Sequence, residues 1–213
     1  MTALATAQYF QAQTQVTDEV LAKLQLYADL LVKWQAKINL VGPDTLPHLW
    51  SRHMLDSAQL GALIPVKAKV VDLGSGAGFP GLVLAIMLKE QGVDVHLVES
   101  DQRKCAFLRE VNRVTGAGAT IHTARIEALE PRDADVVVSR ALASLDKLIN
   151  YADIHRLSTG ICIFMKGKRW QEELTEAQKH WTLGVRDHPS CTEPAGRILV
   201  LNKIARATDL ERD

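Results

Sequence analysis

The chain has 213 residues, of which 47% are hydrophobic and 23% charged, and its 25 basic and 25 acidic side chains give a formal net charge of zero. This length suits one domain with an appendage, and the composition is ordinary for a soluble protein. A net charge of zero excludes attraction of a nucleic acid by the field of the whole chain, so any such surface must be a local basic patch.

Cysteine usage and hydropathy bear on the compartment. Cys105, Cys162 and Cys191 lie far apart and form no C-x-x-C pair, which is typical of proteins in a reducing compartment. The amino-terminal residues carry neither a basic segment nor a long apolar one, and the longest apolar run, 82–88, is too short to span a bilayer. The sequence therefore predicts a cytoplasmic protein without a membrane partner.

Residues 1–65 are predicted to form a helical extension. Apolar side chains recur at three- and four-residue steps from Asp18 to about Ile38, as in an amphipathic helix. Gly42 and Pro43 end this helix. A second helix is expected from about residue 46 to residue 63.

Residues 66–213 are predicted to form one compact α/β domain, because strand and helix patterns alternate. Strands are expected at 70–73, 93–99, 120–123, 135–139 and 160–165, and helices at about 80–88, 104–115, 142–156 and 171–180. This alternation predicts parallel strands with helices on both faces of the sheet. Two more strands, 183–187 and 197–204, are too close in sequence for a helical crossover and should form an antiparallel hairpin.

The stretch VVDLGSGAGFPG at 70–81 predicts a buried strand that leads into a glycine-rich turn and a helix. Gly74, Gly76 and Gly78 permit positive φ and a close approach of a ligand to the backbone. A dinucleotide and S-adenosylmethionine are the common ligands of such a turn. The dinucleotide pattern that starts at Gly74 fails, because Phe79 occupies the third glycine position. Asp72 instead favours a ligand with an amino acid moiety, whose ammonium group needs an acceptor.

Further candidate contacts follow the next strands. Glu99 closes the second strand, where a carboxylate can accept hydrogen bonds from both ribose hydroxyls of an adenosine. Arg125, Ile126 and Glu127 follow the third strand, where the loop would border the adenine ring, with Ile126 against the ring face. The segment SRA at 139–141 ends the fourth strand, at the edge where open α/β sheets bind ligands.

Two kinds of nucleic-acid methyltransferase do not fit the segment 139–141. Enzymes that act on exocyclic amines carry Asp or Asn, two prolines and an aromatic residue there, and cytosine-C5 enzymes need a nearby cysteine nucleophile. Cys162 is expected inside a strand and in the core. No metal site is assigned, because His53 and Asp56 have no Cys or His partner at a fixed spacing, and a buried hydrogen-bonded pair is favoured instead.

Taken together, the motifs of this chain resemble the bacterial glucose-inhibited division protein B family. They are RHMLDS at 52–57, DLGSGAGFPG at 72–81, LVESDQRKCAFL at 97–108, ARIE at 124–127, SRA at 139–141 and FMKG at 164–167, and the likeness runs from about residue 30 to residue 204. Members of that family are 16S ribosomal RNA guanine-N7 methyltransferases. The resemblance implies a Rossmann-like methyltransferase fold with a mostly parallel seven-stranded sheet.

The resemblance also implies a ligand and a set of contacts. The cofactor would be S-adenosylmethionine, with S-adenosylhomocysteine as product. Its site would use Gly74, Phe79, Ile126, Glu127 and Arg140, with Glu99 on the ribose. Val41 departs from the family pattern, where a threonine is expected after Asn39-Leu40, and this affects only a minor contact.

Guanine N7 has an exposed lone pair and no proton to lose, so it can attack the sulfonium methyl group in line without a general base. Arg140, Arg125 and Arg197 are then expected to position the reactants. Lys166, Lys168, Arg169 and Arg197 are expected to bind RNA, with Trp170 able to stack a base. The helical extension would cap the cofactor pocket or present the RNA.

The expected partner is 16S rRNA, within the small ribosomal subunit or an assembly intermediate, and we expect a monomer. The sequence leaves open the target nucleotide and the assembly state of the substrate. Two other functions remain as alternatives, a NAD-dependent dehydrogenase and a non-catalytic RNA-binding module that retains the fold. The first is opposed by the glycine spacing and by the terminal hairpin, which suits a methyltransferase-type sheet.

Overall fold

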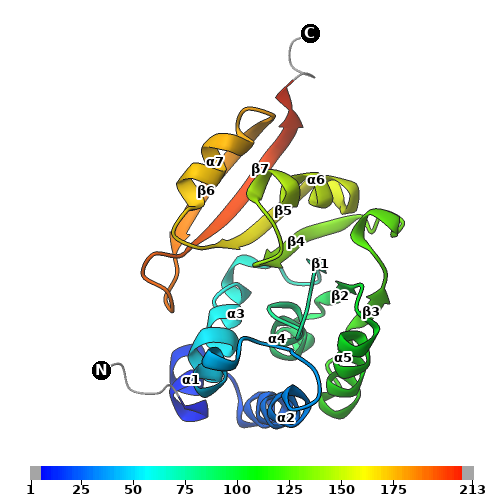
Figure 1. The fold of residues 1–213 in the computed structure, drawn as a ribbon, viewed down its shortest axis with the longest axis vertical. Coiled ribbons are helices and arrows are strands. Elements are labelled where there is room, and N and C mark those ends of the chain that lie inside the picture. Colours follow the sequence, from blue (N-terminus) through cyan, green and yellow to red (C-terminus); the bar gives the residue numbers. More distant parts are fainter. Residues whose placement is uncertain (1–5, 208–213) are drawn as a thin grey trace.

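A single mixed sheet of seven strands forms the centre of the computed structural model, which describes residues 6–207 (Figure 1). The strands are β1 (Lys69–Leu73), β2 (Asp94–Glu99), β3 (Thr120–Thr123), β4 (Ala134–Arg140), β5 (Arg156–Lys166), β6 (Trp181–Pro189) and β7 (Arg197–Arg206). Their order is β3-β2-β1-β4-β5-β7-β6, with β1 to β5 parallel and β7 antiparallel to both β5 and β6. This confirms the predicted mostly parallel sheet and its antiparallel hairpin.

Helices cover both faces of the sheet, as the alternating pattern predicts. In Figure 1, α4 (Gly81–Met87) and α5 (Gln102–Thr115) lie below the sheet, and α6 (Leu145–His155) and α7 (Trp170–Ala177) lie above it. Side chains that alternate along each strand feed two separate cores. Val70, for example, packs in the core that includes α4 and α5, whereas Val71 packs in the core that includes α6 and α7.

The amino-terminal helices pack on the same face as α4 and α5. These are α1 (Ala7–Thr14), which was not predicted, and α2 (Asp18–Gln35), whose first turn is capped by the Thr17 hydroxyl. Phe10 and Tyr27 are fully buried in the core that also holds the α4 side chains. The predicted extension, 1–65, therefore shares the core of the predicted domain, 66–213. Residues 1–5 and 208–213 of these ranges lie outside the described residues.

The single helix predicted over 46–63 is wrong. The chain forms four short pieces there: the 3-10 helix η1 (Pro43–His48), the π-helix η2 (Trp50–Leu55), one α-helical turn, α3 (Asp56–Ala58), and the 3-10 helix η3 (Gly61–Leu63). Pro47 has no amide proton for a helical ladder, and Gly61 weakens a helix. A π-helical turn is rare and is frequently found at functional sites, and here it contains most of the RHMLDS segment, 52–57.

The remaining predicted elements agree with the structure to within a few residues at their ends. The structure adds two short 3-10 turns, η4 (Lys89–Gln91) and η5 (Ile126–Ala128). Within residues 6–207, no helix combines the length and the hydrophobicity that crossing a membrane requires.

Candidate active site

The glycine turn joins β1 to α4 and lies beside the carboxyl end of β2. Gly74, Gly76 and Gly78 all have positive φ, of 71°, 58° and 96°. The Gly76 amide donates a hydrogen bond to Glu99 Oε2 at 2.9 Å, which ties the turn to the end of β2. Gly78 has a packing reason as well, because an added Cβ would lie 2.7 Å from the Tyr27 hydroxyl. The turn is therefore held between the sheet and the amino-terminal helices.

A cavity of about 420 Å³ opens above this turn, and we call it the glycine-turn cavity. Most of the residues that are predicted to contact the cofactor line it. They are Gly74, Gly76, Phe79, Glu99, Ile126, Glu127 and Arg140, and they are joined by Arg125. Four elements of the sheet edge thus bring together residues spread over 67 positions of the chain, from 74 to 140.

Asp72 and Gly78 do not line the glycine-turn cavity. Asp72 is fully buried beneath the turn, and its Oδ2 accepts a hydrogen bond from the Gly81 amide at 3.0 Å. Burial raises the pKa of Asp72 to about 7, although the Gly81 hydrogen bond opposes the shift. Within the described residues, Asp72 Oδ1 has no hydrogen-bond partner. The carboxyl group is thus placed to anchor the start of α4, and it does not reach the cavity wall.

Glu99 is held in one orientation by two backbone amides. Its Oε2 accepts from Gly76 and its Oε1 accepts from Asp101, at 2.9 and 2.8 Å. A carboxylate has about four lone-pair positions, so two acceptor positions remain for ligand hydroxyls. The charge is oriented before a ligand arrives, and this lowers the entropic cost of binding.

Among the residues of the glycine-turn cavity that the sequence analysis missed, two have ionisable side chains. They are Lys104, from α5, and Tyr151, from α6. The Tyr151 hydroxyl donates to Glu127 Oε1 at 2.7 Å. The backbone amide of Glu127 and this hydroxyl lower the pKa of the carboxyl group. No local pattern marks Tyr151, because it lies on an ordinary amphipathic helix.

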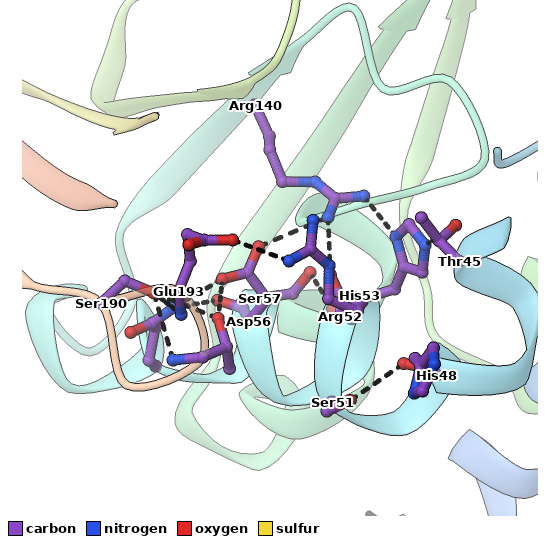
Figure 2. Close-up of polar contacts among 12 residues, drawn as sticks. Thr45, His48, Ser51, Arg52, His53, Asp56, Ser57, Arg140, Ser190 and Glu193 are labelled. Carbon is purple, nitrogen blue, oxygen red and sulfur yellow. Dashed lines mark hydrogen bonds and ion pairs between the residues drawn. The ribbon is translucent and has the colours of Figure 1, made fainter. Parts of the chain in front are cut away.

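Arg140 stands between two cavities at the end of β4. Its guanidinium donates to His53 Nδ1 at 2.8 Å and to the Arg52 carbonyl at 3.0 Å, and lies 3.4 Å from Asp56 Oδ2. It also lies over the Phe79 ring, 5.2 Å from the centroid. Figure 2 shows Arg140 reaching from its strand toward His53 and Asp56 on the helical segment. Arg140 therefore connects the predicted cofactor site to RHMLDS.

His53 is neutral in this arrangement. Burial lowers its pKa to about 3, and the nearby charges of Arg140 and Arg52 add to the shift. Because arginine only donates, Nδ1 of His53 must accept, and Nε2–H then donates to Thr45 Oγ1 at 2.8 Å. The predicted hydrogen bond between His53 and Asp56 is not among the bonds of the described residues, and each of the two side chains instead contacts Arg140, 84 residues or more away in sequence.

A second cavity, of about 550 Å³, lies on the other side of Arg140, and we call it the basic cavity. Its charged lining comprises Arg52, Arg140, Lys166, Arg169 and Arg197, with Asp56, Glu173 and Glu193. Arg140, Ala141 and Leu142 line both cavities, so the two meet at the segment that follows β4. Ala141 has a φ of 52°, a left-handed conformation that costs energy for a residue with a Cβ.

The predicted RNA-binding residues are only partly brought together. Lys166, Arg169 and Arg197 line the basic cavity, whereas Lys168 is exposed outside it. Lys166 is 7% exposed and pairs with Glu173 at 2.6 Å. Trp170 is partly buried against the core, and the Arg197 guanidinium lies over its ring, 5.7 Å from the centroid.

The loop between β6 and β7 forms part of the wall of the basic cavity and is bonded to the helical segment. Thr192 donates a hydrogen bond to Asp56. Arg52 pairs with Glu193 at 2.7 Å (Figure 2). Sequence analysis missed these contacts of Arg52 and Glu193, and no signal in this loop marks them. Among the described residues, no three His, Cys, Asp or Glu side chains gather as metal ligands.

Solved structures with a similar fold are S-adenosylmethionine-dependent methyltransferases. TYW2 from M. jannaschii, in complex with AdoMet, aligns with a TM-score of 0.58 and 18% identity over 80% of each chain. A TehB-like SAM-dependent methyltransferase from Corynebacterium glutamicum aligns with a TM-score of 0.56 and 18% identity, over 85% of this chain and 98% of that one. At this identity the likeness concerns the fold, and it confirms the predicted fold class.

Curated relatives match nearly the whole chain. The ribosomal RNA small subunit methyltransferase G of Paramagnetospirillum magneticum is 58% identical over 90% of this chain and 92% of its own. That of Parvibaculum lavamentivorans is 53% identical over 89% of this chain and 86% of its own. The model of the GidB family, rRNA small subunit methyltransferase G, matches residues 20–197. The chain therefore belongs to the rRNA small subunit methyltransferase G (GidB) family, as its motifs predict.

Proposed function

We propose that the protein transfers a methyl group from S-adenosylmethionine to N7 of a guanosine in 16S ribosomal RNA. Family membership supports the reaction class. The observation that carries the proposal is the meeting of two cavities at Arg140, Ala141 and Leu142. One is lined by the residues predicted to hold the adenosine, and the lining of the other has five cationic and three acidic side chains. A methyl group that crosses this junction passes from the first cavity to the second.

The glycine-turn cavity fits the cofactor. Glu99 keeps lone pairs for the two ribose hydroxyls, and Gly74 and Gly76 present backbone without side chains. Ile126 and Glu127 would border the adenine, with Tyr151 holding the Glu127 carboxylate. When bound there, S-adenosylmethionine supplies an electrophilic methyl group.

The transfer needs no general base. His53 has a pKa of about 3, because it is buried beside Arg140 and Arg52, and its Nδ1 lone pair is already engaged by Arg140. Asp56 accepts from Thr192 and Gln59. The guanidinium of Arg140 cannot accept a proton. Catalysis would then rest on holding N7 in line with the sulfonium methyl group.

The arginines would have different roles in positioning the cofactor and the RNA. Arg125 would order the cofactor loop, and Arg140 would fix the junction between cofactor and base. Arg197, Arg169 and Lys168 would contact RNA, whereas Lys166 would hold the cavity wall through Glu173. We propose a cytoplasmic monomer that acts on the small subunit or on one of its assembly intermediates.

The test combines methyl transfer with mapping of the product. Purified protein and S-adenosylmethionine with a labelled methyl group are incubated with small ribosomal subunits from a strain that lacks the gene. Borohydride and aniline cleave the rRNA at 7-methylguanosine, and we expect one new cleavage site in 16S rRNA. Label at an exocyclic amine would contradict N7 chemistry. Cofactor binding without any transfer would favour a non-catalytic RNA-binding module, and NAD binding in its place would favour a dehydrogenase.

A further inference from the structure

The cations of the basic cavity differ in how firmly the fold holds them. Lys166 and Arg140 are 7% and 19% exposed and are engaged by carbonyl and carboxylate groups of the chain. Arg197 is bonded to Asp187 and to two backbone carbonyls. Arg52 and Arg169 are the exposed cations of this lining. The side chain of Arg52 is 48% exposed, and its one bonded partner among the described residues is Glu193.

Although the side chain of Arg52 is exposed, its backbone is fixed. Its carbonyl accepts a hydrogen bond from the Arg140 guanidinium at 3.0 Å, and the three residues that follow it, 53–55, are buried. The π-helical turn thus places Arg52 at a constant position relative to Arg140. Figure 2 shows the Arg52 side chain directed toward Glu193 and the loop of Ser190.

Glu193 is also carried by an anchored segment. Its amide donates to Ser190 Oγ at 3.2 Å, and the neighbouring Thr192 donates to Asp56. The Cys191 amide donates to Gln59 Oε1 at 3.0 Å. The loop therefore holds the Glu193 carboxylate against Arg52 at the wall of the basic cavity. The carboxylate there takes a position that the anionic group of a ligand could otherwise take.

The pair between Arg52 and Glu193 is easily exchanged. Both side chains are nearly half exposed, at 48% and 44%, and ion pairs of this kind contribute only about 0–1 kcal/mol. A guanidinium has five donors, of which this pair uses one, and it binds phosphate through two parallel hydrogen bonds. A phosphate diester of RNA can therefore take the place of the carboxylate at little cost.

We propose that Arg52 binds a phosphate of the RNA backbone at the wall of the basic cavity, and that Glu193 holds this position in the free protein and is displaced on binding. The inference rests on the proposed function, because it names the contact by which the same RNA substrate docks. Glu193 then works against RNA binding, since the carboxylate competes for Arg52 and repels the incoming phosphate.

The experiment measures affinity for small ribosomal subunits from the gene-deletion strain as a function of salt. Arg52→Gln should weaken binding about tenfold and reduce the salt slope by about one, as expected for one lost phosphate contact. Glu193→Gln should strengthen binding about three- to tenfold. Matched controls are Arg113→Gln and Glu176→Gln, which remove the same charges from exposed pairs on α5 and α7, outside both cavities.

Calorimetric binding of S-adenosylhomocysteine shows that each variant is folded, and we expect wild-type affinity in all four. The inference is overturned if Glu193→Gln binds no more tightly than Glu176→Gln, or if Arg52→Gln keeps the wild-type salt slope. These outcomes leave the proposed function intact as long as the wild-type protein methylates the subunit. If the wild-type protein transfers no methyl group to it, the proposed function itself fails.

Discussion

Arg140 lines both cavities of the candidate site. One planar group bonds to His53, lies near Asp56 and covers Phe79, and it stands where the two cavities meet. The neutral state of His53 belongs to this arrangement, because a protonated ring would place two cations 2.8 Å apart. The contacts of Arg140 therefore depend on the planar geometry of its side chain as well as on its charge.

Replacing Arg140 with Lys keeps the charge and removes the fork, because an ammonium cannot satisfy these partners together. We expect the single-turnover rate of methyl transfer, at saturating cofactor and RNA, to fall by on the order of 10- to 100-fold. Arg113→Lys, on α5, is the matched control and should leave the rate unchanged. Wild-type turnover by Arg140→Lys would show that charge alone suffices.

The pH dependence separates catalysis from stability at His53. The folded pKa is about 3, below the ordinary 6.5, so the unfolded chain binds the proton first as pH falls. The stability that His53 contributes is complete above pH 6.5 and is lost between pH 6.5 and 3, by at most about 1.4 kcal/mol per pH unit. We expect the free energy of unfolding of His53→Gln, measured in urea, to show no such loss as pH falls.

We expect the wild-type rate of methyl transfer to be constant from about pH 6 to 8. A tenfold fall in this rate per pH unit below pH 7 that His53→Gln abolishes would instead identify a catalytic base.

Asp72 should show the opposite sign. Its folded pKa of about 7 lies above the ordinary 3.8, so the folded protein keeps a proton that the unfolded chain has already lost. The contribution of Asp72 is favourable below pH 3.8 and is lost as pH rises toward 7. We therefore expect Asp72→Asn to gain stability relative to the wild type between pH 4 and 8 in denaturant titrations. An unchanged difference across this range would mean that the carboxyl group is ionised throughout.

At the scale of elements, the site depends on the join between β1 and α4. Gly81 begins α4 directly against Asp72, and an added Cβ there would lie 2.3 Å from Leu97 Cδ2 and 2.6 Å from Asp72 Oδ2. Close packing of α4 against β1 thus requires a glycine at this position. The same packing fixes the position of the glycine turn relative to the sheet.

Gly81→Ala should lower the free energy of unfolding by about 1–3 kcal/mol, because a buried strand side chain and the Asp72 carboxyl group must both move. Gly61→Ala is the control, since its Cβ would meet only Leu88, at an ordinary 3.7 Å. Urea unfolding measures the free energy of unfolding of both variants, and we expect its dependence on urea concentration to be the same for the two. Equal stability of the two would mean that α4 shifts freely against β1.

At the scale of the whole molecule, the amino-terminal helices and the sheet share one core. Phe10 on α1, Tyr27 on α2 and Leu84 on α4 are fully buried in it, and the Tyr27 hydroxyl donates to the Ala77 carbonyl within the glycine turn. Folding of the helices and shaping of the turn are therefore coupled, although the segments lie 50 residues apart.

This coupling predicts cooperative unfolding. Phe10→Ala should destabilise the protein by about 3–5 kcal/mol, and native-state hydrogen exchange should show the same loss in α2 and in β1. Tyr9→Ala, one position away on α1 and half exposed, should have little effect. Loss of protection in α1 and α2 alone would show that the helices form a separate folding unit.

The sequence by itself determined the alternating strands and helices, the terminal hairpin and the glycine turn. These features depend on side-chain periodicity and on turn residues, which act over a few positions. For the same reason Glu99, Ile126 and Glu127 were found as strand-end residues, and the structure brings them to one cavity. Their contact with the cofactor stays a prediction.

Only the tertiary structure decided the conformation and the contacts of the segment RHMLDS. An apolar pattern over 46–63 favours one helix, yet the segment breaks into a π-turn whose Arg52 carbonyl is bonded by Arg140, 88 residues away. The side chain of Asp72 is covered by α4, and Glu193 meets Arg52 across 141 residues. Hydrogen bonds and packing between such distant segments determine these positions, and no local pattern along the chain encodes them.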